Sequence, residues 1–196
     1  FFIYSSSNVF FCYLLVYHFY LLLLILTSYL LGSVPTSIII GKIVRGIDIR
    51  DYGSGNAGGT NVFRVLGLKP ALFVIFVDVF KGWFPASVLA RIFFETQSIP
   101  DLGVVQILCG FSAVLGHTYT IFSRFKGGKG VGTLGGVMIA LFPSVFLFCL
   151  VIAITTIVLT GYVSLASIIS SCSLPILLIL LLTEVVAVGS FEKEKN

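Results

Sequence analysis

Long apolar runs are the feature of this sequence that most limits its fold. They occupy residues 9–31, 70–94, 102–121, 131–141, 144–160 and 163–188. A helix needs about 20 apolar residues to cross a bilayer, and most of the runs reach or approach that length. Only 10% of the 196 residues are charged, whereas soluble domains hold about 25%. The sequence therefore predicts an all-α polytopic membrane protein, a helix bundle that forms a single domain over residues 1–196.

Two parts of this pattern need interpretation. Only 11 residues precede Pro143 in the run 131–141, so residues 131–160 form either one kinked crossing or two compact ones. The run 9–31 is too long for a signal peptide and lacks a basic segment before it. We therefore expect a retained first helix with its amino end outside, followed by a break at Gly32-Ser-Val-Pro35 and a short helical extension over 36–44.

Lysine and arginine gather in two polar stretches, which indicates how the chain is oriented. The first holds Lys42, Arg45, Arg50, Arg64 and Lys69, and the second holds Arg124, Lys126 and Lys129. The two crossings between these stretches are joined by a short connection with Glu95 and Asp101 but no Lys or Arg. Two crossings return the chain to the side it left, so the positive-inside rule predicts that both stretches are cytoplasmic.

Other residue types that often mark a site are uninformative here. The four cysteines are scattered singly through apolar stretches without a CxxC pair, and we read them as small hydrophobic residues, with no metal site expected. His18 lies within the first apolar run and is read as a packed or interfacial histidine. The net charge of +4 is modest, and no nucleic-acid partner is expected.

Both basic stretches contain a glycine-rich loop. The first is Gly53-Ser-Gly-Asn-Ala-Gly-Gly-Thr-Asn61, followed by a short helix near Asn61–Leu66, and the second is FKGGKGVGT at 125–133. Glycines let backbone amides converge on an anion, and a helix that begins after the loop adds free amides. Arg64 offers a planar fork for phosphate and Lys129 a mobile point charge, so we expect a phosphate site.

Three other kinds of site fail at one or two positions each. A Walker A loop needs Gly and Ser or Thr where the chain has Ser123 and Gly130. The GxSxG elbow of serine hydrolases needs Gly where the chain has Tyr52. His117 lies beside the second loop, where it contacts substrate or caps the helix, and Phe122 stands where an HxxxxD acyltransferase motif needs Asp.

Two opposite charges lie within the apolar run 70–94. Asp78 and Lys81 are three residues apart and therefore share one face of a helix. Charges inside a membrane segment are costly, so we expect a mutual pair that faces the bundle interior or a polar cavity. We expect the pair to lock helices or to position the neighbouring loops.

Four segments together resemble a known family. They are Asp48-Ile-Arg50 with GSGNAGGTNVFRVLG (53–67), VDVFKG (77–82), GHTYTIFSRFKGGKGVGT (116–133) and YVSLAS (162–167). In this order and spacing they resemble the acyl-phosphate:glycerol-3-phosphate acyltransferase family, PlsY, over residues 24–183. The family is identified by its first two motifs, which are long and specific.

The resemblance implies an integral membrane enzyme of seven helices, which favours two crossings over 131–160. It implies transfer of an acyl chain from acyl phosphate to the 1-position of glycerol 3-phosphate in a bacterial plasma membrane, without cofactor or metal. The residues carried over are Ser54, Arg64 and Lys129 as catalytic groups, and Asn56, Thr60, Asn61, His117, Gly127, Gly128 and Gly130 as substrate-binding groups. The sequence does not indicate an oligomeric state.

The carboxyl end departs from the family's pattern. The resemblance implies a seventh helix and a third motif similar to GHRENIRRL, whereas residues 182–196 read LTEVVAVGSFEKEKN. We therefore expect six of the seven helices, in a chain that is truncated, frameshifted or divergent near its end. Two alternatives to an active acyltransferase stay open: an inactive homologue, and a membrane transporter or channel for a phosphate-bearing solute.

Overall fold

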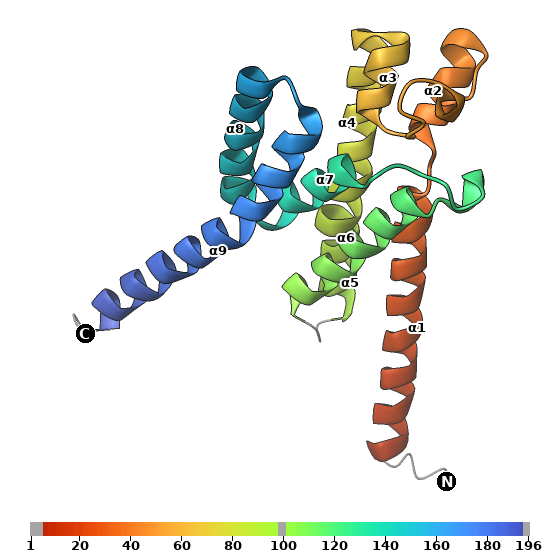
Figure 1. The fold of residues 1–196 in the computed structure, drawn as a ribbon. Coiled ribbons are helices and arrows are strands. Elements are labelled where there is room, and N and C mark those ends of the chain that lie inside the picture. The colour runs from red at the N-terminus through yellow and green to blue at the C-terminus, as the bar shows by residue number, and fades with distance from the viewer. Residues whose placement is uncertain (1–5, 98–100, 194–196) are drawn as a thin grey trace. The chain divides into compact units, whose positions relative to one another are not determined.

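The computed structural model describes residues 6–97 and 101–193, and all regular structure in them is helical, as predicted. In chain order the elements are α1 (Ser6–Gly32), α2 (Thr36–Arg45), η1 (Ile49–Asp51), α3 (Gly59–Leu66), α4 (Leu68–Phe84), η2 (Pro85–Leu89), α5 (Ala90–Gln97), α6 (Leu102–Thr118), η3 (Ile121–Ser123), α7 (Val131–Leu141), α8 (Pro143–Thr160) and α9 (Val163–Lys193). The chain divides after Leu141 into two compact units, and Figure 1 shows the helices of each.

Within the described residues, five helical segments are long and apolar enough to cross a membrane. They are Phe11–Arg45, Leu68–Glu95, Leu102–Ser123, Pro143–Thr160 and Val163–Leu181. The predicted segment 131–141 forms a shorter apolar helix, α7, of 11 residues. Phe142 leaves the helical conformation between α7 and α8, so residues 131–160 form two separate helices.

The first unit begins with a long helix that is interrupted once. Pro35 has no amide hydrogen and disfavours a helical conformation at Val34, which separates α1 from α2 at the expected break. α2 then ends at Gly46, whose φ of 69° is left-handed and whose amide donates to the carbonyl of Lys42. The predicted extension over 36–44 is thus confirmed as α2.

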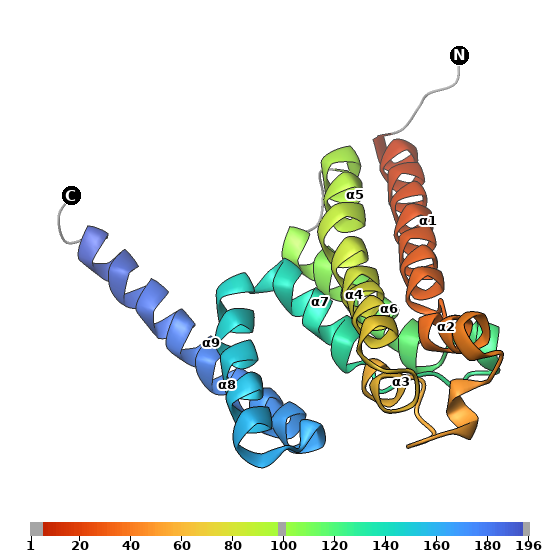
Figure 2. The same cartoon turned by 90° about the horizontal axis from the view of Figure 1, so that it is seen from above.

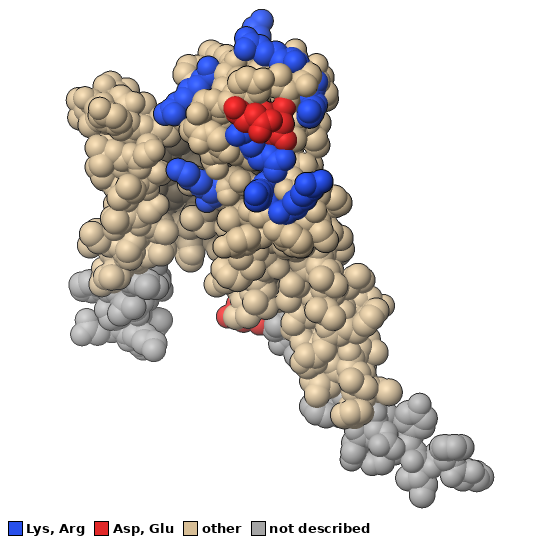
Figure 3. All heavy atoms as spheres, turned by 45° about the vertical axis from the view of Figure 1, so that its right-hand side comes forward, with Lys and Arg blue, Asp and Glu red and all other residues tan. Residues whose placement is uncertain are grey.

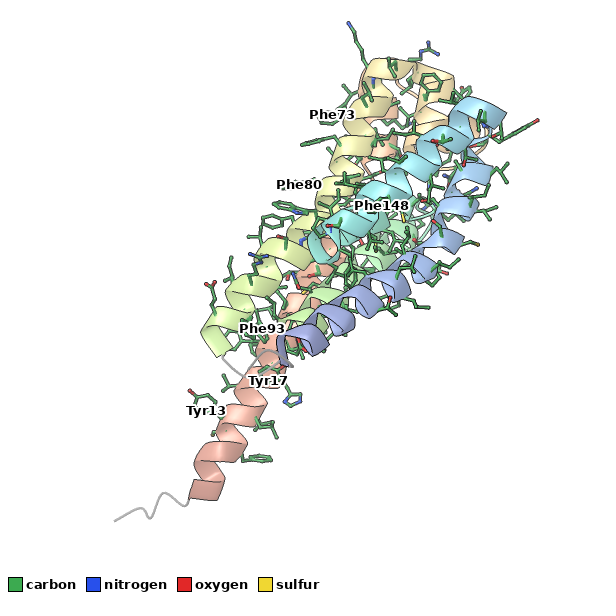
Figure 4. The ribbon with its side chains drawn as sticks, turned by 90° about the vertical axis from the view of Figure 1, so that its left-hand side faces the viewer. Tyr13, Tyr17, Phe73, Phe80, Phe93 and Phe148 are labelled. Carbon is green, nitrogen blue, oxygen red and sulfur yellow. The ribbon has the colours of Figure 1, made fainter. Side chains whose placement is uncertain are left out.

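The expected run 70–94 forms one continuous helical stretch. α4 passes through η2, a π-helical turn that begins at Pro85, and continues as α5. Phe73 and Phe80 project from α4 away from the other helices of the unit (Figure 4), and both side chains are exposed. In a membrane protein such apolar side chains face lipid.

Glycines allow the helices of the first unit to cross closely. A Cβ on Gly116 of α6 would overlap the Tyr29 carbonyl of α1, and one on Gly136 of α7 would overlap the Val79 carbonyl of α4. Figure 2 shows α4, α6 and α7 side by side, in agreement with their contacts. Small residues at crossings are how membrane helices associate, because lipid supplies no hydrophobic force between them.

Two apolar clusters complete the unit. Leu24 of α1, Phe93 of α5 and Cys109 of α6 belong to the first, and the ring of Tyr17 lies 5.7 Å from that of Phe93 (Figure 4). The second joins Ile49, Val62, Ala71 and Val74, so that η1 and α3 pack on α4. The polar segment between α2 and α4 is therefore anchored to the helix bundle at its base.

The second unit is a pair of helices. α8 and α9 are joined by Gly161, with a φ of 73°, and Tyr162. The two helices pack on each other, and the Ser170 hydroxyl of α9 donates to the Cys149 carbonyl of α8 at 2.9 Å.

Candidate active site

A pocket opens in the first unit where several parts of the chain meet. It is lined by residues 34–38 around the start of α2, Ala57, Asp78 and Lys81 of α4, His117, Thr120, Gly127 and Gly128. Figure 3 shows Lys and Arg side chains gathered around a small acidic group, at the end of the unit where Figure 1 places α2 and α3. The pocket therefore combines groups from both glycine-rich loops with an ion pair from a membrane helix.

The ion pair is Asp78 and Lys81. The Lys81 Nζ lies 2.9 Å from Asp78 Oδ1, and each side chain is only 6% exposed. His117 Nδ1 lies 3.6 Å from the same carboxylate oxygen and has no hydrogen-bond partner among the described residues. The prediction that the two charges pair and face a polar cavity is thus confirmed, and His117 retains a free hydrogen-bonding atom.

The helix break beside the pocket is held by side chains from other elements. Lys81 Nζ donates to the Val34 carbonyl at 3.0 Å, and the Thr120 hydroxyl donates to the Ser33 carbonyl. The Tyr29 hydroxyl in turn donates to the Tyr119 carbonyl at 2.6 Å. A break in a helix frees carbonyl groups that must find new donors in a membrane, and the bonds from Lys81 and Thr120 supply them.

Asn61 organises the first loop from its buried position at the start of α3. Its Nδ2 donates to the carbonyls of Ile49 and Tyr52 at 2.9 and 3.0 Å, and its Oδ1 accepts from the Ser54 amide at 2.8 Å. The amide group is thereby bonded to the backbone of its own loop through both of its polar atoms. These bonds tie η1 and the segment around Ser54 to the helix that carries Arg64.

The second loop begins with a tight turn after α6. Arg124 and Phe125 both have left-handed φ angles, 57° and 59°, which are uncommon for residues other than glycine. The Phe125 amide donates to the Thr120 carbonyl at 2.8 Å, and the Ser123 hydroxyl donates to the Lys126 carbonyl at 3.0 Å. The turn thus closes on itself before the glycines begin.

The backbone amides of Gly127 and Gly128 already donate hydrogen bonds within the protein. They donate to the carbonyls of Thr118 and His117, at 3.0 and 3.2 Å. The expectation that these amides wrap an anion is therefore wrong for these two residues, because the end of α6 supplies their acceptors. The two glycines instead allow close packing. A Cβ on Gly128 would overlap the His117 imidazole and lie 2.8 Å from the Ala57 carbonyl.

The guanidinium of Arg50 connects the loops. Its Nε and Nη2 donate to the two carboxylate oxygens of Asp48, at 3.0 and 2.7 Å, and its Nη1 lies 3.2 Å from the Ser123 carbonyl and 3.4 Å from that of Lys126. The hydrogen bonds from Arg50 hold the pKa of the Asp48 carboxyl below its ordinary value. Together with the Ala57–Gly128 approach, these bonds confirm that the two loops lie on one face.

The predicted site residues fall into two groups in the structure. Ser54, Thr60, Arg64 and Lys129 are exposed and Asn56 and Gly127 are half-buried, whereas Asn61, His117, Gly128 and Gly130 are buried. Arg64 and Lys129 form no ion pair with any described residue. Their roles stay predictions.

Sequence reasoning missed two contributors. Residues 34–38 line the pocket, although the sequence marked them only as the end of a helix break and the start of a helical extension. Arg50 was counted as a positive charge and as part of the motif Asp48-Ile-Arg50, but no role was predicted for it. Asp78 and Lys81 were expected to pair, but their position in the pocket wall could not be read from their spacing.

Known proteins share this architecture, a membrane helix bundle with a polar pocket. The chain matches the glycerol-3-phosphate acyltransferase family over residues 22–191. Proteins named glycerol-3-phosphate acyltransferase from Chlorobium phaeobacteroides (strain BS1) and Chlorobaculum parvum (strain DSM 263 / NCIMB 8327) are 46% and 44% identical to it over 141 residues. The alignments cover 69% of this chain, which spans about 60% of the length of these curated relatives.

Two solved structures are similar as well. They are crystal structures of PlsY, an integral membrane glycerol 3-phosphate acyltransferase, in its glycerol 3-phosphate form and in its lysophosphatidic acid form. Both are 40% identical to the chain and cover 82% of it and 76% of PlsY, with TM-scores of 0.73 and 0.71. The chain belongs to the glycerol-3-phosphate acyltransferase family.

Proposed function

We propose that this chain, as a single acyltransferase domain, transfers an acyl group from acyl phosphate to the 1-hydroxyl of glycerol 3-phosphate. The observation that carries the proposal is the pocket between the two glycine-rich loops, in a member of this family. Further support comes from the similar PlsY structures, whose two forms are named for glycerol 3-phosphate and lysophosphatidic acid. We further propose that the protein lies in a bacterial plasma membrane with both loops facing the cytoplasm.

The proposed reaction needs no covalent intermediate on the protein. The 1-hydroxyl oxygen attacks the acyl carbonyl carbon and forms an ester bond, while the bond from that carbon to the phosphate oxygen breaks. The hydroxyl proton passes to the departing phosphate, so the products are lysophosphatidic acid and inorganic phosphate. Because acyl phosphate is already activated, the protein has to position both substrates and stabilise charge.

The loop residues divide these tasks in our proposal. Arg64 and Lys129 bind the phosphate groups, since both cations are exposed and lack an ion-pair partner among the described residues. The Ser54 hydroxyl hydrogen-bonds substrate and does not act as a nucleophile, because no base in the described part of the chain is paired with it. His117 Nδ1, buried in the pocket wall without a hydrogen-bond partner among the described residues, offers a further hydrogen bond to substrate.

The pocket wall also suggests where a phosphate lies relative to these groups. Lys81, Gly127 and Gly128 all line the same pocket. The amides at the start of α7, from Gly130 onward, follow directly after Lys129, and amides at a helix start favour an anion. A phosphate beside the pocket would therefore meet the Lys81 ammonium and the amides at the start of α7, whereas Arg64 and Lys129 are not among the residues that line the pocket.

A synthesis assay tests the function directly. The purified chain in detergent should form lysophosphatidic acid and phosphate from palmitoyl phosphate and glycerol 3-phosphate, and Lys129→Ala should form them about 10- to 100-fold less efficiently. The same chain in vesicles serves for a transport assay with radiolabelled glycerol 3-phosphate. Uptake of solute without product would show that the chain is a transporter and not an enzyme. Binding of glycerol 3-phosphate without either activity would indicate an inactive homologue.

A further inference from the structure

We propose that Arg50 is a positioning residue that locks the second glycine-rich loop against the first, and so sets where Lys129 stands relative to Arg64. Its kinetic consequence rests on the proposed function. The lock itself is a property of residues 48–50 and 123–126, and it can be measured without activity.

The Asp48 carboxylate orients the guanidinium. It accepts from Arg50 Nε and Nη2 through its two oxygens and also from the Arg50 backbone amide at 3.0 Å. The two side-chain bonds fix the plane of the guanidinium, and the backbone bond holds the carboxylate in place. Because one edge is held in this way, Nη1 is the nitrogen that reaches the second loop.

The two carbonyls that Nη1 reaches bracket the left-handed residues of the turn. Ser123 precedes Arg124 and Phe125, and Lys126 follows them. A left-handed conformation is unfavourable for both of these side chains, so the turn needs support from its surroundings. Arg50 supplies that support from outside the turn, in addition to the bond from the Ser123 hydroxyl to the Lys126 carbonyl.

Both ends of the lock lead to a predicted phosphate ligand. On one side, Asn61 ties the carbonyl of Ile49, which neighbours Arg50, to the helix that carries Arg64. On the other side, Lys129 follows Lys126 by three residues. The bonds of Arg50 therefore link Arg64 to Lys129 through short backbone segments.

The guanidinium is poorly suited to bind phosphate itself. Its Nε, Nη1 and Nη2 all have acceptors, its charge is balanced by Asp48, and its side chain is 29% exposed. Arg64 and Lys129, in contrast, are exposed and form no ion pair within the described residues. The contacts thus assign Arg50 to the loops and leave the phosphates to the other two cations.

Limited proteolysis measures the lock in the purified chain. Trypsin should cut after Arg124, Lys126 and Lys129 about tenfold faster in Arg50→Ala, because charge-assisted hydrogen bonds no longer hold the turn. The matched control is Arg45→Ala, since Arg45 is also exposed on the first basic stretch but forms no ion pair with any described residue. Equal cutting rates in Arg50→Ala and Arg45→Ala would overturn the proposal, whether or not the chain is an enzyme.

The variant Asp48→Asn distinguishes a positioning role of Arg50 from direct phosphate binding, because the two roles predict opposite changes in KM. It weakens the lock, so we expect faster cutting and a rise in KM for glycerol 3-phosphate of about tenfold. If Arg50 bound phosphate directly, removal of the competing carboxylate would lower KM instead, and the proposal would fail. This variant also provides the test if Arg50→Ala does not fold.

Two further variants test the geometry. Arg50→Lys keeps the charge but has one nitrogen in place of the three that reach Asp48 and the two carbonyls, so it should resemble Arg50→Ala in both assays. Phe125→Gly, which tolerates the left-handed conformation, should restore part of the resistance to trypsin and of kcat/KM in Arg50→Ala. Wild-type activity in Arg50→Lys, or no rescue by glycine in either assay, would contradict the lock. A wild-type chain without acyl transfer but with the expected cutting pattern would reject only the proposed function.

Discussion

The Lys81 Nζ lies 2.9 Å from Asp78 Oδ1, and the pair connects three separate elements of the first unit. Lys81 also donates to the Val34 carbonyl at the break between α1 and α2, and Asp78 approaches His117 near the end of α6. Burial of one charge inside a membrane helix is costly unless the opposite charge compensates it. The pair therefore holds together the wall of the pocket that does not come from the loops.

Breaking this pair should destabilise the protein. Asp78→Asn leaves the Lys81 ammonium buried without its counter-charge, and we expect a loss of about 3–5 kcal/mol in the free energy of unfolding. In a chain whose exposed Cys12 and Cys172 are replaced by serine, a thiol-reactive dye that reaches the buried Cys109 and Cys149 on unfolding reports thermal unfolding in detergent. The control is the double variant Asp78→Asn, Lys81→Met, which removes both charges and should recover part of the stability. A double variant no more stable than Asp78→Asn would contradict this account.

Removal of either exposed cation should abolish most activity without loss of folding. We expect Arg64→Ala and Lys129→Ala each to lower kcat/KM by about 10- to 100-fold, because each deletes a charge-assisted phosphate contact of about 1.5–3 kcal/mol. Arg45→Ala is the matched control and should keep its activity. Near-normal kinetics in both variants, with unchanged thermal midpoints, would exclude these residues as phosphate ligands.

Asn61 should matter for the structure of the first loop. Asn61→Asp keeps an acceptor for the Ser54 amide but loses the donor for the carbonyls of Ile49 and Tyr52 and buries a negative charge. We expect a lower thermal midpoint and faster trypsin cleavage after Arg50. Each buried carbonyl left without a donor lowers the free energy of unfolding by about 1–3 kcal/mol. Thr60→Ala, at the exposed neighbouring position, is the control. An Asn61→Asp variant with wild-type stability but a raised KM would assign Asn61 to substrate.

Close helix contact should make Gly136 intolerant of any side chain. A Cβ there would overlap the backbone carbonyl of Val79, which cannot rotate away. We expect Gly136→Ala to cost about 1–3 kcal/mol through displacement of α7 from α4. Leu134→Ala, at an exposed position of the same helix, serves as the control in the same thermal assay. Equal midpoints for the two variants would show that the crossing has room to spare.

The Asp48–Arg50 lock should open only in acid. Because Arg50 holds the pKa of Asp48 below its ordinary value of 3.8, the folded protein binds the proton less readily than the unfolded chain. Its stabilisation is therefore complete above that ordinary value and is lost as the pH falls through the lowered pKa. Carbon-13 NMR of the Asp48 carboxyl in micelles measures the midpoint, which should rise in Arg50→Ala. An unchanged midpoint would show that the ion pair does not form in solution.

The membrane helices were largely predictable because their signal is local. A run of apolar residues must satisfy its own backbone hydrogen bonds in lipid, so length and composition alone indicate a helix. The break at Pro35 and the end of the run before Pro143 follow equally from the missing amide hydrogen of proline. The pairing of Asp78 with Lys81 followed from their spacing by three on one helix face.

The loops behaved differently. Glycine, arginine and lysine in two basic stretches indicated an anion site, and the residues Arg64 and Lys129 were apparent from chemistry alone. However, the amides of Gly127 and Gly128 proved to be bonded to the end of α6, and Asn61 to the backbone of its own loop. The residue types could be interpreted from the sequence, but the partners of their hydrogen bonds could not be predicted from it.

By itself, then, the sequence determined that this chain is a membrane helix bundle with two cationic, glycine-rich loops and an internal ion pair. Only the tertiary structure decided that Arg50 meets Ser123 across 73 positions of the chain, and that Lys81 meets Val34 across 47. Such contacts depend on how helices cross, and crossings are set by the packing of many side chains together. A hydrogen bond between distant residues therefore leaves no periodic pattern in the sequence, whereas a helix does.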